Sequence, residues 1–287
     1  MAWPGPRVPR AKRSLSQCFL VDRNVQKKVV DALEAKPGDS VLEIGPGHGE
    51  LSAHLVGTVR HLCVVEKDER LAEALAERWK GCPEVRVVAA DALKLDLDRY
   101  VRDLSPYRVL SNLPYNVTSP LLFALLSLRP APERILVTVQ REVAQRLVAR
   151  PGTSSYGALS VGVQVRADPA VVMTIGRGCF RPVPKVDSAV LRIDPAPARA
   201  AELSSARLRR LTRVAFGRRR KQLQKILRTA PEYRLSAARI DALCEELDLD
   251  PRMRPQDLTP RQYVELAARL PPAGDVPSCP RAGDEAS

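Results

Sequence analysis

"SVLEIGPGHGELSAHLV", residues 40–56, joins an apolar strand pattern to a helical pattern through a turn rich in glycine. The first five residues are mostly apolar and include β-branched side chains, which is typical of a buried strand. Gly45-Pro46-Gly47-His48-Gly49 follows directly. Such a turn lets a ligand approach the backbone, and a helix N-terminus behind it favours an anion. Alone, the turn is only a weak indication of a nucleotide site.

The alternation of strand and helix patterns continues along the chain. Further strand-like runs lie at 62–68, 85–91, 108–114 and 134–140, with helical segments such as Glu69–Lys80 and Pro120–Leu128 between them. Near-continuous apolar strands that alternate with helices predict an α/β fold with a parallel sheet covered on both faces. Two more runs, 170–176 and 188–194, are joined without a helix and predict an antiparallel pair at the end of the sheet.

The pattern changes after Asp194. The segment DPAPARAAEL predicts a linker, and residues 203–270 have a helical pattern without a strand-like run. We therefore predict two domains, at 14–195 and 200–270. The flanking segments 1–13 and 271–287 are predicted to be disordered tails.

Charge and cysteine content narrow the class of protein. The chain has 46 Lys and Arg against 33 Asp and Glu, a net charge of +13, which favours a polyanionic partner such as nucleic acid. The six cysteines form no CxxC pair and the three histidines have no clustered carboxylate or thiol, so we expect no metal site. With no signal core and no uncharged membrane span, we expect a cytoplasmic protein with reduced cysteines.

Acidic residues at the ends of the next two strand runs strengthen the case for a nucleotide ligand. Glu66 lies 21 residues after Gly45, the spacing of a carboxylate that accepts both ribose hydroxyls. Asp91 ends the third run, where a carboxylate can accept a hydrogen bond from an adenine amine. Because the carboxyl ends of parallel strands share one edge of a sheet, the ligand is expected to carry a ribose and an adenine.

Two cofactors fit this description. A dinucleotide needs the third glycine of GxGxxG for its pyrophosphate, but position 50 is Glu50, whose charge would repel phosphate. S-adenosylmethionine has one carboxylate to place and carries a positive sulfonium that tolerates nearby acid. The sequence therefore favours S-adenosylmethionine.

The fourth strand run ends in Asn112-Leu113-Pro114-Tyr115, beside the expected methyl group. An exocyclic amine on a base is a poor nucleophile because its lone pair is delocalised into the ring. The Asn112 side-chain oxygen and the Leu113 carbonyl can each accept one of its N–H bonds, which frees the lone pair for attack. Since Tyr115 can stack on a base, the motif predicts methyl transfer to an exocyclic amine.

A set of longer motifs then points to one family. They are SLSQCFLVD, VLEIGPGHG, VVEKD, AADAL, NLPYNVTSPLL, VQREVAQRLVA, YGALSVGVQ, CFRPVPKVDSAV and AFGRRRKQLQKIL. In this order, between Ser14 and Leu270, they closely resemble the KsgA/RsmA small-subunit ribosomal RNA adenine dimethyltransferases. The resemblance implies a class I (Rossmann-like) methyltransferase sheet of seven strands with a small C-terminal α-helical domain.

The resemblance also implies the reaction and its partners. The expected reaction is S-adenosylmethionine-dependent dimethylation of the N6 amines of two adjacent adenosines near the 3′ end of 16S rRNA. The expected partners are small-subunit rRNA and the assembling small ribosomal subunit, met late in assembly, and we expect the enzyme to be a monomer.

Site residues follow from the resemblance position by position. It implies cofactor contacts by Gln17, Cys18, Leu20, Gly45, Gly47, Glu66, Asp91 and Asn112. For the target base it implies a pocket of Asn112, Leu113 and Tyr115, with Phe180 as a second aromatic face. Position 18 departs from the family, which usually has Asn in GQNFL, so the Cys18 side chain lacks the amide that would contact the cofactor.

A separate basic segment predicts the RNA contact. Residues 207–228 include ten basic residues and no acidic one. A solvated helix face usually mixes both signs, whereas a run of one sign repels itself unless a polyanion neutralises it. We expect a helix broken near Gly217. The predicted RNA contacts are Arg207, Arg210, Arg218, Arg219, Arg220, Lys221, Lys225 and Arg228.

Two other functions stay compatible with the sequence. Large-subunit rRNA adenine methyltransferases share the pocket chemistry, although FRPVPKVDSAV and AFGRRRKQLQKIL favour the small-subunit family. A non-catalytic assembly factor would also bind pre-ribosomes, but intact Glu66, Asp91 and Asn112 favour an enzyme.

Overall fold

The computed structural model describes residues 17–114, 117–201 and 205–271. The chain divides into two compact units, Met1–Val148 with Arg166–Pro197, and Ala149–Val165 with Ala198–Ser287. Segment 149–165, expected in the first domain, is grouped with the second unit because its helix α6 (Ala158–Gln164) packs against helices of that unit. The predicted tails at 1–13 and 271–287 lie outside the described residues, except for Pro271.

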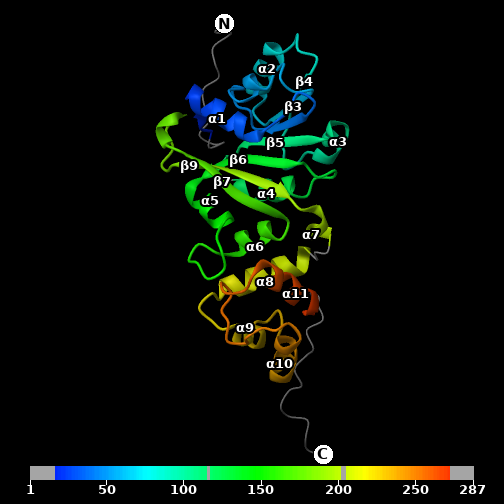
Figure 1. The fold of residues 1–287 in the computed structure, drawn as a ribbon, viewed down its shortest axis with the longest axis vertical. Coiled ribbons are helices and arrows are strands. Elements are labelled where there is room, and N and C mark those ends of the chain that lie inside the picture. Colours follow the sequence, from blue (N-terminus) through cyan, green and yellow to red (C-terminus); the bar gives the residue numbers. More distant parts are fainter. Residues whose placement is uncertain (1–16, 115–116, 202–204, 272–287) are drawn as a thin grey trace, which may run out of the picture. The chain divides into compact units, whose positions relative to one another are not determined.

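The elements appear in sequence colours in Figure 1. The strands are β1 (Phe19–Leu20), β2 (Ser40–Ile44), β3 (His61–Glu66), β4 (Val85–Ala89), β5 (Tyr107–Asn112), β6 (Arg134–Gln140), β7 (Ala167–Ile175), β8 (Phe180–Arg181) and β9 (Ser188–Pro195). Besides α6, the α-helices are α1 (Arg23–Leu33), α2 (Glu69–Arg78), α3 (Leu97–Val101), α4 (Thr118–Leu125), α5 (Arg141–Leu147), α7 (Pro197–Ala201), α8 (Ser205–Gly217), α9 (Leu223–Thr229), α10 (Ala237–Glu246) and α11 (Pro260–Arg269).

Within the described residues, seven strands form one sheet in the order β4-β3-β2-β5-β6-β9-β7. The pairs from β4 to β6 are parallel, whereas β9 is antiparallel to both β6 and β7. This arrangement confirms the predicted fold class and the antiparallel pair at one end of the sheet. Every residue of β2 is buried, as expected for a central strand of a sheet covered on both faces.

The register of the strands positions one edge of the sheet for a ligand. Ile44 of β2 lies opposite Val65 of β3 and Ser111 of β5, so these strands end level with one another. Glu66 lies opposite Ala89 of β4. The chain runs outward from β2 to β4 and then returns to β5 on the other side. Open α/β sheets bind ligands where the strand order reverses in this way.

Two local features differ from the sequence expectation. The segment after the glycine turn forms only a 3-10 turn, Ser52–His54, rather than a helix over 50–56. The anion-binding contribution of a helix N-terminus is therefore missing there. In addition, β1 and β8 form a small separate antiparallel sheet that the sequence pattern did not indicate.

The second unit is a helical cluster with its own core. Buried side chains of α6, α8, α9, α10 and α11 pack together in it. The Tyr156 hydroxyl donates to the Leu258 carbonyl at 2.9 Å, and the Tyr263 hydroxyl donates to the Pro255 carbonyl at 2.6 Å. These bonds tie loop segments to the buried core.

Candidate active site

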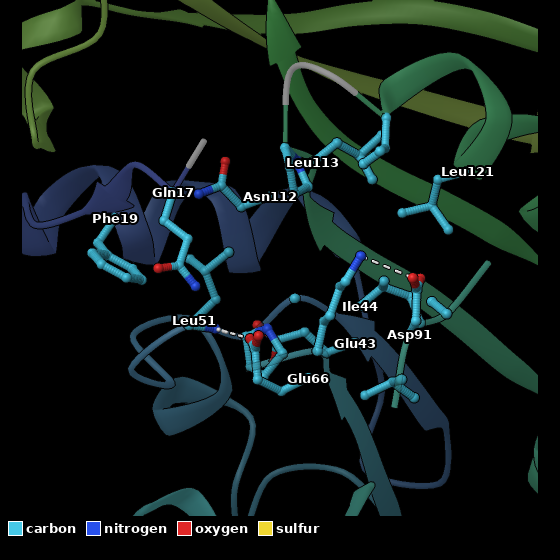
Figure 2. A pocket seen from close by; sticks show the side chains of 18 of the residues that line it. Gln17, Phe19, Glu43, Ile44, Leu51, Glu66, Asp91, Asn112, Leu113 and Leu121 are labelled. Carbon is cyan, nitrogen blue, oxygen red and sulfur yellow. Dashed lines mark hydrogen bonds and ion pairs between the residues drawn. The ribbon is translucent and has the colours of Figure 1, made fainter. Parts of the chain in front are cut away.

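A cavity opens at the carboxyl edge of the sheet and collects most of the predicted site residues. Those that line it are Gln17, Cys18, Leu20, Gly45, Gly47, Glu66, Asp91, Asn112 and Leu113. They come from β1 and the two residues before it, from the glycine turn, and from the ends of β3, β4 and β5. Figure 2 shows Glu66, Asp91 and Asn112 around this one space.

The glycine turn and Glu66 hold each other in place. Gly45 and Gly47 have φ values of 69° and 63°, which side chains other than glycine rarely adopt. The Gly47 N–H donates to Glu66 Oε2 at 3.1 Å, and the Asp68 N–H donates to Glu66 Oε1 at 2.9 Å. Each carboxylate oxygen keeps a further lone pair, so Glu66 can accept from two ribose hydroxyls while its orientation stays fixed. Burial raises the pKa of Glu66 above its ordinary value.

Asp91 lies just beyond β4 and has a different electrostatic environment. Its Oδ2 is 2.9 Å from the Lys67 ammonium nitrogen, and its Oδ1 accepts from the Leu93 N–H at 3.1 Å. The hydrogen bond from Lys67, helped by the charge of that residue, holds the pKa of Asp91 below its ordinary value. Asp91 is therefore an ionised acceptor at neutral pH.

Asn112 is oriented by the backbone of the N-terminal segment. Its Nδ2 donates to the Cys18 carbonyl at 3.0 Å. The N–H of the next residue, Leu113, donates to the Thr138 carbonyl at 3.1 Å on the neighbouring strand. With the amide nitrogen engaged, the Asn112 oxygen is the end of the side chain that can accept an amine N–H.

Two carboxyl groups in the cavity were missed as site residues. Glu43 is fully buried within β2, and burial raises its pKa to about 8 while Ser52 Oγ donates to it at 2.6 Å. Burial also raises the pKa of Glu50 to about 7. The sequence feature that could have identified Glu43 as a site residue is an acidic side chain within an otherwise mostly apolar strand pattern. Both groups can lose a proton and become negatively charged when a cation enters the cavity.

Of the predicted aromatic residues, Phe180 lies in the core of the first unit and Tyr115 lies outside the described residues. The Phe180 side chain is only 1% exposed, belongs to the core of the first unit and does not line the cavity. Strand β8 pairs Phe180 with Leu20 of β1, which fixes the ring among core residues. In this structure Phe180 therefore presents no face to the cavity, and its role as a second aromatic face stays a prediction.

The predicted RNA-contact residues separate into two groups in the structure. Arg207 donates to the Ala268 carbonyl at 3.0 Å, and Arg210 donates to the Pro271 carbonyl and stacks over the Tyr233 ring. These two side chains serve the packing around the end of α11. The other six lie on the turn after α8 or on α9: Arg218, Arg219, Arg220, Lys221, Lys225 and Arg228.

Loops of the second unit bring further basic residues to this turn. Arg219 donates to the Thr153 carbonyl at 2.8 Å, which ties the turn to the loop that carries exposed Arg150. The Leu223 N–H donates to the Met253 carbonyl at 2.7 Å, which joins the turn to a loop with exposed Arg252 and Arg254. Sequence reasoning missed these three arginines because the contacts between loops are remote in sequence.

The described part of the chain offers no evidence for a metal or a membrane span. No group of three or more His, Cys, Asp or Glu side chains within it could hold a metal ion. Likewise, none of its helices is long and apolar enough to cross a membrane.

Comparison with known proteins gives the same family as the motifs. The family model described as ribosomal RNA adenine dimethylase matches residues 8–270. The protein named Ribosomal RNA small subunit methyltransferase A of Nitratidesulfovibrio vulgaris (strain DP4) is 42% identical over 261 residues, covering 90% of this chain and 96% of that protein. The protein of the same name from Geobacter metallireducens is 38% identical over 268 residues, covering 91% and 96%.

Solved structures agree with this result. A dimethyladenosine transferase from Plasmodium falciparum has a TM-score of 0.73 at 25% identity and covers 86% of this chain and 95% of that one. The 23S rRNA methyltransferase ErmE has a TM-score of 0.64 at 27% identity, covering 88% and 99%. The resemblance seen in the motifs is confirmed, and the chain belongs to the ribosomal RNA adenine dimethylase family.

Proposed function

We propose that this enzyme transfers methyl groups from S-adenosylmethionine to the N6 amines of two adjacent adenosines near the 3′ end of 16S rRNA. Two methyl groups would go to each adenosine, late in the assembly of the small subunit in the cytoplasm. The choice of the small subunit is supported by relatives of that name at 36–42% identity, against 27% for the 23S rRNA methyltransferase structure.

The observation that carries the proposal is the fixed orientation of Asn112. Its Nδ2 donates to the Cys18 carbonyl, so its oxygen is available to accept one N–H of the target amine. The Leu113 carbonyl is the second acceptor in the proposal. An amine held by two acceptors has its lone pair directed at the methyl group, and the gain comes from positioning rather than from a strong base.

The proposed cofactor site uses the strand-end acids. When bound, S-adenosylmethionine would supply an electrophilic methyl group on a positive sulfonium. Glu66 accepts from the ribose hydroxyls, and Asp91 accepts from the adenine amine. Gln17, Leu20 and the Gly45–Gly47 turn line the same cavity.

For the RNA we propose a basic surface on the second unit. It comprises the six residues Arg218, Arg219, Arg220, Lys221, Lys225 and Arg228, extended by Arg150, Arg252 and Arg254. Guanidinium and ammonium groups on tied loops suit phosphate contacts, which position RNA without reading its sequence.

Transfer of labelled methyl groups tests the proposal. Small subunits that lack the modification should accept four methyl groups per subunit, and large subunits should accept none. Asn112→Ala should lower the rate on the order of a hundredfold to a thousandfold, as does loss of a positioned hydrogen-bonding group in other enzymes. Binding to the subunit should stay nearly unchanged.

Asn24→Ala is the matched control, because Asn24 is exposed at the start of α1 and does not line the cavity. This variant should keep full activity. Wild-type protein that binds small subunits without transferring methyl groups would point to an assembly factor. Transfer to large subunits would point instead to the other rRNA methyltransferase class.

A further inference from the structure

The Lys67–Asp91 ion pair lies at one end of the cavity, and the mechanism above gives Lys67 no role. The Lys67 ammonium nitrogen lies 2.9 Å from Asp91 Oδ2, and both residues line the cavity. Figure 2 marks this contact with a dashed line at Asp91. The Lys67 side chain is 56% exposed and that of Asp91 is 22% exposed, so the pair faces the opening rather than the core.

We propose that Lys67 is a positioning residue for adenine recognition, acting through Asp91. The inference rests on the proposed function, since it concerns the adenine of the same cofactor. Lys67 occupies one lone-pair direction of Oδ2, and the Leu93 N–H occupies one of Oδ1. Both oxygens are thereby fixed, and each keeps a lone pair to accept from an amine.

The charge of Lys67 has a second consequence. A carboxylate accepts an amine N–H only while it is ionised, because a protonated carboxyl presents a donor in its place. Lys67 lowers the pKa of Asp91 by its hydrogen bond and its charge, and Lys94 adds a smaller effect of the same sign from the following turn. An aspartate is ionised near neutrality in any case, so the effect of Lys67 is to keep Asp91 an acceptor further into the acid range.

Lys67 is adjacent in sequence to the other carboxylate residue of the proposed adenosine site. Lys67 directly follows Glu66, whose carboxylate is pinned by the Gly47 and Asp68 N–H groups. Two consecutive residues at the end of β3 therefore serve both carboxylates that accept from an adenosine: Glu66 is one of them, and Lys67 orients the other, Asp91. The ligand class read by the pair is an adenine nucleoside with a free exocyclic amine.

Calorimetric binding of S-adenosylhomocysteine to the full chain tests the inference. Lys67→Met keeps the aliphatic stem and removes the charge, and should weaken binding roughly two- to fivefold, the range for a partly exposed ion pair. Lys67→Arg should restore it. In an Asp91→Asn background, Lys67→Met should have no further effect, because the lysine acts through that carboxylate. Lys80→Met, which removes an exposed lysine outside the cavity, is the control and should bind like the wild type.

A readout on the free protein separates positioning from general structure. The pKa of the Asp91 carboxyl, followed by NMR, should rise in Lys67→Met. Losses that add in the double variant, or an unchanged Asp91 pKa, would overturn the inference while wild-type binding keeps the proposed function intact. Failure of the wild type to bind S-adenosylhomocysteine would overturn the cofactor assignment and this inference with it.

Discussion

Replacing Gly47 by alanine tests whether the glycine turn is shaped for a ligand. The residue has φ +63, and an added Cβ would lie 2.8 Å from two ring atoms of Phe19. The His48 ring lies 4.1 Å from the Phe19 ring between centroids, so Phe19 cannot move in that direction without displacing it. Moving the backbone instead would disturb the Gly47 N–H bond to Glu66.

The loss of stability expected in Gly47→Ala has two parts. An L-residue in the left-handed region costs about 1–2 kcal/mol, and forcing a methyl group into a packed site costs about 1–3 kcal/mol more. Gly57→Ala separates them, because Gly57 has φ +74 but nothing within 4 Å of the added Cβ. Gly57→Ala should therefore lower the free energy of unfolding by the first part only, and should leave cofactor affinity unchanged.

Urea unfolding and calorimetry with S-adenosylhomocysteine measure both effects. We expect Gly47→Ala to lose about 2–5 kcal/mol of stability and at least about tenfold in affinity, since Glu66 is held by the displaced N–H. Phe19→Leu in the Gly47→Ala background should recover part of the stability. If Gly47→Ala and Gly57→Ala were equal in both measurements, the steric argument would be refuted.

Two further predictions concern ionisation and RNA. The pKa of Glu43 is about 8 in the folded protein against an ordinary 4.5, so between these pH values folding takes up a proton. The free energy of unfolding should therefore fall by about 1.4 kcal/mol per pH unit as the pH rises through this window. Glu43→Gln should flatten this pH profile, measured by urea unfolding between pH 5 and 8. If six basic residues contact phosphate, the affinity for small-subunit rRNA should fall on the order of a thousandfold between 50 and 200 mM salt. The double variant Arg220→Gln with Lys221→Gln should lower the slope of log affinity against log salt by about 1.4–1.8. Arg261 is already paired with the Glu265 carboxylate at 2.8 Å, so Arg261→Gln should leave the slope unchanged. Equal slopes in the wild type, the double variant and Arg261→Gln would contradict the proposed RNA surface.

The parts of the fold that the sequence predicts correctly are those that local pattern determines. The run SVLEI is apolar because β2 is buried along its whole length, so its sequence alone marks it as a central strand. The acids Glu66 and Asp91 follow such runs, and parallel pairing then brings strand ends to one edge. Their meeting in one cavity needed no further information than strand order and direction.

The parts that were missed depend on contacts remote in sequence. Strands β1 and β8 have two residues each, too few for a periodic pattern, and their pairing alone decides that Phe180 is buried. The hydrogen bond of Arg207 depends on the end of α11, some sixty residues later. The raised pKa of Glu50 depends on burial, which charge and spacing along the chain do not report.

Cys18 illustrates both what the local sequence predicts and what contacts remote in sequence decide. The family's usual Asn at this position suggested that the Cys18 side chain lacks a cofactor contact, and this stays a prediction. A separate contact is made by the Cys18 backbone carbonyl, which accepts from Asn112 Nδ2 whatever the side chain is. The place of that carbonyl follows from β1, which is held by pairing with β8. Phe180 therefore supports the site through the backbone, besides the predicted role of its ring. Its burial anchors β8, β8 pairs with β1, and the residue before β1 supplies the carbonyl that accepts from Asn112 Nδ2.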